Sequence, residues 1–187
     1  MVSPLRRSTG VSVATETSSP PAEAERASES FEDLYRRTFP RVYAYVASLL
    51  RDRSSAEEVT AQAFERAYRR RSSYRPPRGP VEAWLFGIAR NAALDELRRR
   101  SRRARIEHEP PDATAPAAED EADGLLRRAT VRVALASLDA RERDLIALKF
   151  SGGLSNAEIA RVLGMSESNA GTRLHRTIEK LRRACHE

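Results

Sequence analysis

Apolar residues in this chain are spaced for helices. The first apolar set recurs at intervals of three, four and seven residues, like one face of a helix, and comprises Phe31, Leu34, Tyr35, Val42, Val46 and Leu49. No segment alternates apolar and polar residues with the period of two that marks a half-buried strand. The spacing therefore predicts an all-α fold. Pro40 interrupts the first set, so a kink or a restart of the helix is expected there.

Composition divides the chain into four segments. Residues 1–30 are rich in Ser, Thr, Pro, Ala and Glu without apolar periodicity, which predicts a disordered N-terminal extension. Residues 31–105 and 125–187 keep the helical spacing and are predicted to form two small helical domains. Residues 106–124 contain seven acidic side chains and neither Lys nor Arg, so they are predicted to form a flexible acidic linker.

Start and stop signals divide the first domain into three helices. The second helix is expected to begin at one of two overlapping capping boxes within Ser54–Glu58. The segment Ser72–Pro80 (SSYRPPRGP) holds too much proline for a helix and is predicted to be a loop. Pro80 suits the first position of the third helix, which runs into the arginine-rich stretch 98–105.

Two helices are expected at the start of the second domain. The first spans Leu125–Leu138, and its apolar side consists of Leu126, Ala129 and Val133. The second follows a start signal made by Asp139 and Glu142, and its apolar side consists of Leu145, Ile146 and Phe150.

Two short helices around one glycine form the most specific pattern. Ser155–Glu158 is a capping box, Gly164 ends the helix that follows, and Ser166 caps the next helix. This arrangement predicts a DNA-binding helix-turn-helix, and the alternative is an ordinary surface helix of a bundle. The residues of the second helix that would meet bases or phosphates are Ser166, Glu167, Ser168, Asn169, Thr172, Arg173 and Arg176. Gly171 within it either admits the DNA backbone or is simply tolerated.

Charge and cysteine content narrow the class of protein. The chain of 187 residues has a formal net charge of +6, and all its basic residues except Lys149 and Lys180 are arginines, which bind phosphates and guanine edges well. Cys185 is the only cysteine, and no apolar run approaches the roughly 18 residues of a membrane span. We therefore expect a cytoplasmic protein that is not inserted in a membrane and that binds a polyanion.

The segment Gly152–Ser166 (GGLSNAEIARVLGMS), followed by Thr172–Arg176 (TRLHR), resembles the C-terminal promoter-binding domain of the extracytoplasmic-function sigma factors of bacterial RNA polymerase. Residues 31–105 resemble the N-terminal domain of that family through FEDLYRRTFPRVYAYVASLL, AEEVTAQAFERAYRR and VEAWLFGIARNAALDELRRR. The resemblance implies a domain 2-like bundle and a domain 4-like helix-turn-helix. It also implies a factor that binds core RNA polymerase, recognises minus-ten and minus-thirty-five elements and helps to melt DNA.

The same resemblance implies partners and roles for particular residues. The helix with Ala56–Arg70 would dock on the clamp of the largest polymerase subunit, through Glu57, Glu58, Gln62, Phe64 and Arg66. Ala61 and Gln62 depart from the family's usual residues there. The minus-ten and melting contacts would come from Ser73, Tyr74, Arg75, Arg78, Arg90, Asn91, Arg98 and Arg99. The second domain would bind the polymerase flap, and an anti-sigma factor is a candidate partner.

Three points stay open at the level of the sequence. Tyr74 is the better candidate for stacking on an unpaired base, whereas Trp84 is at least as well explained as core. The acidic linker either threads into the nucleic-acid channels of the polymerase or is a solvated spacer. A stand-alone helix-turn-helix regulator is the second hypothesis, but only a sigma factor accounts for the loop, the helix after it and the arginine run together.

An enzyme is the third hypothesis and has little support. The histidines show no metal-ligand spacing and lie at His108, His175 and His186. No nucleophile and base are placed together, and paired carboxylates cluster only in the linker. No catalytic residue, metal or cofactor is therefore expected.

Overall fold

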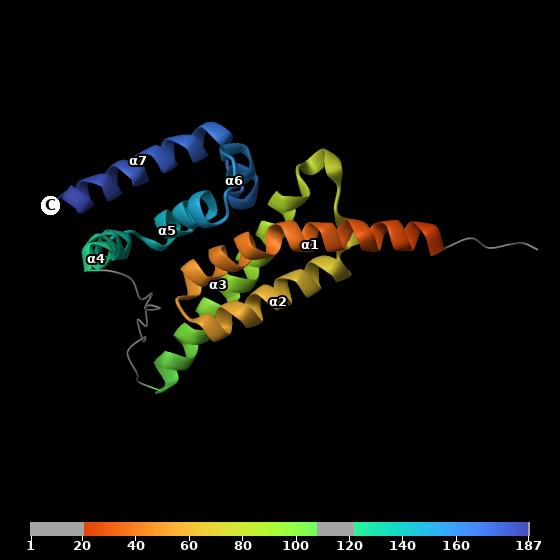
Figure 1. Cartoon of the computed structure of the whole chain (residues 1–187), viewed down its shortest axis with the longest axis horizontal. Coiled ribbons are helices and arrows are strands. Elements are labelled where there is room, and N and C mark those ends of the chain that lie inside the picture. The colour runs from red at the N-terminus through yellow and green to blue at the C-terminus, as the bar shows by residue number, and fades with distance from the viewer. Residues whose placement is uncertain (1–20, 108–121, 187) are drawn as a thin grey trace, which may run out of the picture.

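The computed structural model describes residues 21–107 and 122–186, with side chains described for residues 31–106 and 129–185. Every regular element in these ranges is a helix, which confirms the predicted all-α fold (Figure 1). The α-helices are α1 (Pro21–Leu50), α2 (Arg53–Arg69), α3 (Val81–Glu107), α4 (Ala122–Ala136), α5 (Ala140–Ile146), α6 (Asn156–Leu163) and α7 (Glu167–His186). Short turns are η1 (Arg71–Ser73) and η2 (Pro76–Arg78), both 3₁₀, and the π-helical η3 (Ala147–Ser151).

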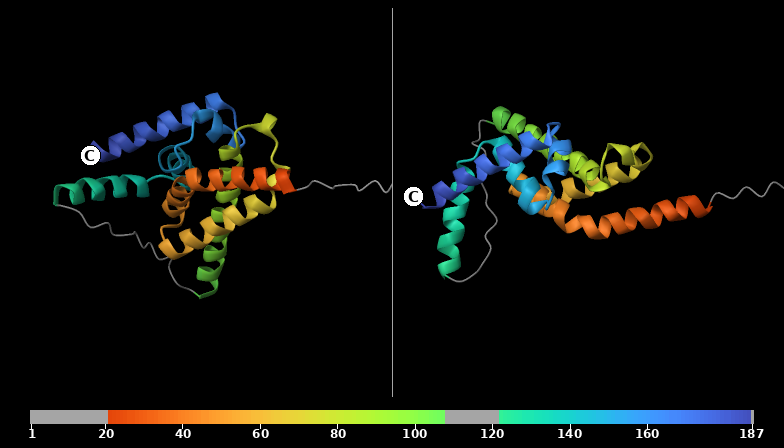
Figure 2. Two further views of the ribbon diagram at one scale, coloured as in Figure 1. Left: turned by 45° about the vertical axis from the view of Figure 1, so that its right-hand side comes forward. Right: turned by 90° about the horizontal axis from the view of Figure 1, so that it is seen from above.

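Helices α1, α2 and α3 form the N-terminal domain, in which α3 crosses the other two (Figure 2). An aromatic cluster joins α1 to α2, because the ring of Phe64 lies 4.7 Å from that of Tyr35 and 5.8 Å from that of Phe39. Helix α1 starts at Pro21, so it extends ten residues into the segment expected to be disordered. It also continues through Pro40 and bends in its second half rather than restarting (Figure 1).

The start of α2 differs from the prediction. The N-cap is Asp52, whose carboxylate accepts a hydrogen bond from the Ser55 amide at 3.0 Å. Hydrogen bonds from Ser55 lower the pKa of Asp52, with a further contribution from the nearby guanidinium of Arg100. Arg100 also donates to the carbonyl oxygen of Leu50, at 3.2 Å. One arginine of α3 therefore fixes the turn between α1 and α2.

Helices α4 to α7 form the C-terminal domain, and the predicted start of α5 is confirmed. Asp139 accepts from the Glu142 amide at 2.8 Å, while the Glu142 carboxylate accepts from the Asp139 amide, also at 2.8 Å. The chain then widens into η3, whose extra residue per turn rotates the helix face. Leu148 is fully buried as a result and Phe150 is 65% exposed, so the expectation of an inward Phe150 is wrong.

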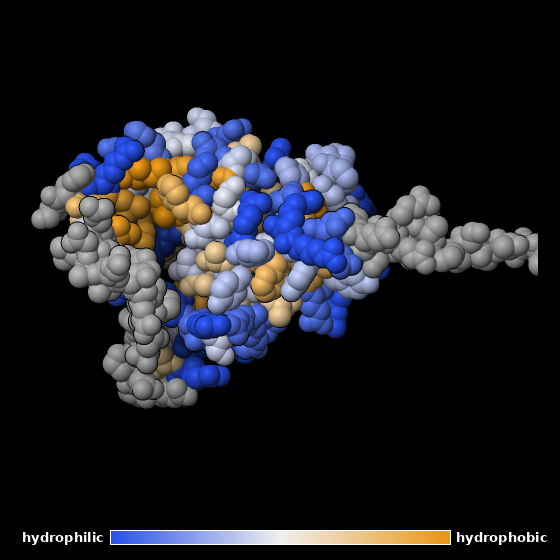
Figure 3. Space-filling model, in the orientation of Figure 1, coloured by the Kyte–Doolittle hydropathy of each residue, from blue (hydrophilic) through white to orange (hydrophobic). Residues whose placement is uncertain are grey.

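The apolar side of α4 also differs from the prediction. Ala134 and Leu138 are buried, whereas Ala129 and Val133 are exposed, Val133 to 71%. Apolar surface gathers on the C-terminal domain over α4 and α7 (Figure 3). Helix α4 therefore has a second apolar face that nothing in the described part of the chain covers.

The two domains pack against each other through a common core. Phe86 of α3 contacts Tyr45 of α1 edge-on, at 5.6 Å between ring centres, and Leu148 and Leu154 of the C-terminal domain belong to the same buried cluster. The sequence predicted two domains on a flexible tether and gave no sign of this contact. Most of the predicted linker lies outside the described residues, but α3 reaches Glu107 and α4 begins at Ala122.

Candidate nucleic-acid interface

The predicted helix-turn-helix is present as α6 and α7. The Ser155 hydroxyl accepts from the Glu158 amide at 3.3 Å, and the Glu158 carboxylate accepts from the Ser155 amide at 2.7 Å, so the capping box is confirmed. Gly164 ends α6 in the left-handed conformation, with φ 67° and ψ 41°. The Ser166 hydroxyl then accepts from the Asn169 amide at 3.3 Å and caps α7.

Helix α7 presents one face to solvent and buries the other. Ala170, Leu174 and Thr177 are buried against the rest of the domain. All the predicted DNA-contacting residues of this helix are exposed, namely Ser166, Glu167, Ser168, Asn169, Thr172, Arg173 and Arg176. The exposed face therefore has the composition of a surface that can meet bases and phosphates.

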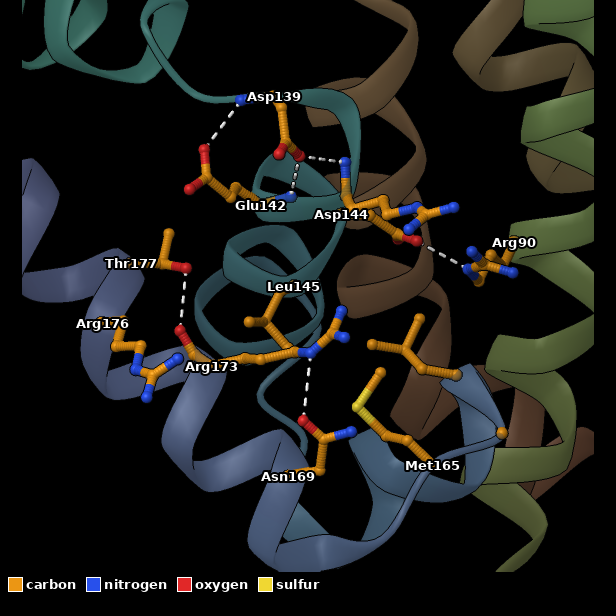
Figure 4. Close-up of a pocket in the computed structure, with 13 residues that line it drawn as sticks. Arg90, Asp139, Glu142, Asp144, Leu145, Met165, Asn169, Arg173, Arg176 and Thr177 are labelled. Carbon is orange, nitrogen blue, oxygen red and sulfur yellow. Dashed lines mark hydrogen bonds and ion pairs between the residues drawn. The ribbon is translucent and has the colours of Figure 1, made fainter.

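A hollow of about 570 Å³ lies beside this face, at the edge of the C-terminal domain where it meets α3 (Figure 4). Arg173 and Arg176 of α7 border it together with Arg141 of α5 and Arg90 of α3. The Arg173 guanidinium is oriented by Asn169, to whose side-chain oxygen it donates at 3.0 Å. Asp139, Glu142 and Asp144 also line the hollow, and Arg90 is paired with Asp144, so its wall carries charges of both signs.

The predicted loop Ser72–Pro80 has a defined structure. It contains no α-helix, as expected, but 3₁₀ turns η1 and η2 shape it. The Tyr74 hydroxyl donates to the Gly79 carbonyl oxygen at 3.0 Å and closes the loop on itself. Ser73 and Arg75 donate to neighbouring backbone carbonyl oxygens, and Arg78 is exposed.

A pocket of about 470 Å³ lies between this loop and α3. Tyr74 and Trp84 stand on its wall with their ring centres 5.6 Å apart, and Asn91 also lines it. Trp84 is only half-buried and packs against the core with part of its surface, and its stacking on a base stays a prediction. Two aromatic faces and an amide around a cavity form a site that can receive an unpaired base.

The other minus-ten candidates are placed differently. Asn91 is exposed, and Arg98 and Arg99 are exposed but pair with Asp95 and Glu96 of their own helix, at 3.0 and 2.8 Å. Burial acts to raise the pKa of Glu96, but hydrogen bonds from Arg100 and Arg99 outweigh it and lower the pKa overall.

The candidate polymerase contacts lie on α2. Glu57, Glu58 and Arg66 are exposed, and Gln62 is half-buried and donates to Glu58 at 3.0 Å. Phe64 is only 4% exposed and belongs to the aromatic cluster, so its expected role as a surface contact is wrong for this structure. The Phe64 side chain packs inside the domain and supports α2, which carries the other four candidate polymerase contacts.

Sequence reasoning missed the charged residues at the junction between the domains. Asp144 of α5 is 3% exposed and accepts from the Tyr45 hydroxyl at 2.8 Å. It also accepts from Arg90 Nε at 2.6 Å (Figure 4). Burial, together with the Asp144 charge, raises the pKa of Tyr45 well above its usual value. Helical spacing could have predicted this burial, because Asp144 lies four residues before Leu148, on the buried side of α5.

Metal and membrane sites have no support among the described residues. No group of three His, Cys, Asp or Glu side chains there is arranged to hold a metal ion. None of the helices described is long and apolar enough to cross a membrane.

Comparisons with known proteins agree with both halves of the structure. Residues 34–103 match the family model for Sigma-70 region 2, and residues 128–181 match the one for Sigma-70 region 4. The RNA polymerase sigma factor CarQ of Myxococcus xanthus is 37% identical over 157 residues, 83% of this chain and 89% of CarQ. The ECF RNA polymerase sigma factor SigL of Mycobacterium tuberculosis is 32% identical over 82% of this chain and 88% of SigL.

Two solved structures share the fold. The sigma factor RpoE of Bartonella quintana, in complex with the anti-sigma factor NepR, aligns with a TM-score of 0.67 and 23% identity, over 83% of this chain and 96% of that one. CnrH, in complex with the cytosolic domain of CnrY, aligns with a TM-score of 0.61 and 24% identity, over 85% and 91%. With the two family matches in their expected order and relatives aligned over most of their length, the chain belongs to the extracytoplasmic-function sigma factors, the promoter-recognising initiation factors of RNA polymerase.

Proposed function

We propose that the two domains divide the work of promoter recognition. The N-terminal domain, residues 31–105, binds the polymerase clamp through the exposed side of α2 and binds the minus-ten element through the loop and α3. The C-terminal domain, residues 125–187, binds the minus-thirty-five element through the exposed face of α7 and contacts the flap. The placement of the candidate side chains on these surfaces supports this division.

The pocket beside the loop carries the proposal for the minus-ten element. Promoter melting requires a base to leave the stack, which costs a few kcal/mol unless a shaped site receives it. Tyr74 and Trp84 supply aromatic faces, and Asn91 supplies hydrogen-bonding groups at the rim. In this proposal one unpaired base stacks on Tyr74 and Trp84 while the loop holds the backbone around it.

Permanganate footprinting of promoter thymines tests this proposal. With core polymerase, Tyr74→Ala should abolish the reactivity of melted thymines and leave polymerase binding unchanged, because α2 is untouched. Tyr74→Phe is the matched control, since it keeps the ring and removes only the hydrogen bond to Gly79. Melting by Tyr74→Ala at the wild-type level would show that the loop is only a connector.

The wider assignment is tested by purification and transcription. The chain should co-purify with core polymerase and direct transcription from promoters found by sequencing RNA after induced expression. We also propose that it acts in the cytoplasm, with its polymerase, and has no catalytic activity of its own. Absence of polymerase subunits from the purified material, with no transcript from any enriched promoter, would refute this assignment.

An anti-sigma factor is a proposed regulator of this chain. The structurally similar RpoE of Bartonella quintana was determined in complex with the anti-sigma factor NepR. Helix α4 offers exposed apolar side chains of the kind that a partner helix packs against, and Val133 is 71% exposed. A purified regulator should block transcription by the wild-type chain and lose this effect on Val133→Glu, and inhibition that is unchanged in this variant would place its contact elsewhere.

A further inference from the structure

Gly87 of α3 is a glycine that the described part of the chain does not need. It lies inside the helix, beyond the first turn, where glycine is destabilising relative to alanine. Its φ is not positive, so the backbone at this position does not require a glycine. A Cβ added to Gly87 would meet no atom within 4 Å, so no neighbouring group requires its absence either.

The other glycines within residues 31–106 and 129–185 differ from Gly87. Three of them have a positive φ, namely Gly79, Gly153 and Gly164. A Cβ on Gly152 would be crowded by three neighbouring groups, and a Cβ on Gly171 would still have a neighbour at 3.5 Å. Gly87 alone among them has neither a positive φ nor a neighbour, which indicates that the open space serves something outside the chain.

The space beside Gly87 belongs to the pocket between the loop and α3. Trp84 lies three residues before Gly87 and Asn91 four residues after it, so the three share one face of the helix. All three line the pocket, and the ring of Tyr74 stands 5.6 Å from that of Trp84. Gly87 is therefore the stretch of bare backbone between the aromatic pair and the Asn91 amide.

A side chain at position 87 would cover the ring of Trp84. Long side chains in a helix lie over the preceding turn, towards the residues three and four positions earlier. For position 87 these residues are Ala83 and Trp84, and both line the pocket. Trp84 is half-buried, so little of its surface remains to be covered. The missing Cβ of Gly87 thus keeps the accessible part of this ring open.

The lining of the pocket favours a nucleotide as the occupant of this space. Three arginines line the pocket and no acidic residue does; they are Arg75, Arg78 and Arg161. Guanidinium groups bind phosphates, and aromatic faces stack on unpaired bases. The pocket therefore offers partners to both the phosphate and the base of one nucleotide.

We propose that Gly87 is a specificity-determining position of this pocket, where the absence of a Cβ lets an unpaired promoter base lie directly against α3. One face of the base stacks on Trp84, and its edge points towards the Asn91 amide. This inference rests on the proposed role of the pocket in minus-ten recognition. Glycine disfavours the helix of the free chain and favours the complex with DNA, so substitutions at position 87 should change stability and binding in opposite directions.

Gly87→Leu in the full-length chain, assembled with core polymerase, tests this inference. The probe is a promoter fragment with a premelted minus-ten element, from which single unpaired bases are removed in turn to leave abasic sites. The wild type should bind one of these abasic fragments roughly tenfold more weakly than the intact fragment. Gly87→Leu should bind the intact fragment roughly tenfold more weakly than the wild type does, and the same abasic site should weaken it no further.

Ala140→Leu is the matched control, because it adds a leucine side chain at an exposed helical position that does not line the pocket. It should bind both fragments as the wild type does. Gly87→Leu should unfold at the wild-type temperature or above it, because leucine favours a helix over glycine. Acrylamide should quench Trp84, the only tryptophan of the chain, less in this variant. Gly87→Ala should change binding in the same direction by a smaller factor, which keeps the inference testable if the leucine variant does not fold.

Two results would overturn the inference while leaving the proposed base pocket in place. The first is wild-type affinity of Gly87→Leu for the intact fragment, with Trp84 quenched as in the wild type. The second is a Gly87→Leu variant that the abasic site weakens as much as it weakens the wild type, since the base would then not lie against Gly87. A wild type that no abasic site weakens would instead refute the base pocket itself.

Discussion

Gly152 is a position where one added methyl group should disturb the junction between the domains. A Cβ there would lie 2.7 Å from the carbonyl oxygen of Leu148, 2.9 Å from Cε1 of Phe86 and 3.0 Å from Cδ1 of Leu154. The backbone angles of Gly152, φ −77° and ψ −23°, are ordinary for any residue. Alanine at this position would therefore act through crowding alone.

None of the three neighbouring atoms can move freely. The Leu148 carbonyl oxygen accepts a hydrogen bond from the Leu154 amide at 3.1 Å, and the side chains of Leu154 and Phe86 are buried. Overpacking of a filled core costs about 1–3 kcal/mol, and contact with backbone on one side places Gly152→Ala at about 2 kcal/mol. For a chain of this length the melting temperature should fall by roughly 4–8 °C.

Thermal and urea unfolding of the full chain, followed by helical circular dichroism, measures this effect. Gly87→Ala is the matched control, because a Cβ on Gly87 meets no atom within 4 Å and the residue lies inside α3. Alanine favours a helix over glycine by about 0.5–1 kcal/mol, so the control should be as stable as the wild type or more so. An unchanged midpoint for Gly152→Ala, or an equal loss in both variants, would refute the packing argument.

Arg173→Ala and Arg176→Ala should weaken binding to minus-thirty-five duplex at fixed salt, by about 1–3 kcal/mol where a base is read. Fluorescence anisotropy measures this affinity, with Arg182→Ala as the control. Wild-type affinity in both variants would mean that the wrong face of α7 was chosen. Gly171→Ala should stabilise the chain by about 0.5–1 kcal/mol, because alanine favours a helix over glycine and the added Cβ meets nothing closer than 3.5 Å. Loss of DNA binding alongside that gain in stability would show that the DNA backbone approaches Gly171. The lowered pKa of Glu96 stabilises the fold above the unfolded-state pKa of about 4.3, and this contribution is lost as the pH falls below that value. Between neutral and acid pH, the urea midpoint of Glu96→Gln should therefore fall less than that of the wild type. Identical pH profiles for the two proteins would contradict this.

Features that depend on neighbouring residues could be predicted from the sequence alone. The capping boxes at Asp139 and Ser155 were predictable because a cap joins a side chain to an amide two or three residues away. The left-handed end of α6 followed from Gly164, which has no Cβ to oppose a positive φ. The exposed face of α7 followed from helical spacing, and the family resemblance followed from the same local patterns.

The contacts of each surface, by contrast, depend on how the helices pack. The π-helical turn shifted the helix face and exposed Phe150, and packing between α1 and α2 buried Phe64. The pairing of Arg90 with Asp144 joins residues 54 positions apart, and that of Tyr45 with Asp144 joins residues 99 apart. Spacing along the chain reports on the nearest turns, whereas such pairs depend on how whole helices pack. Tertiary packing therefore decided that the two domains close on the surfaces proposed to bind promoter DNA.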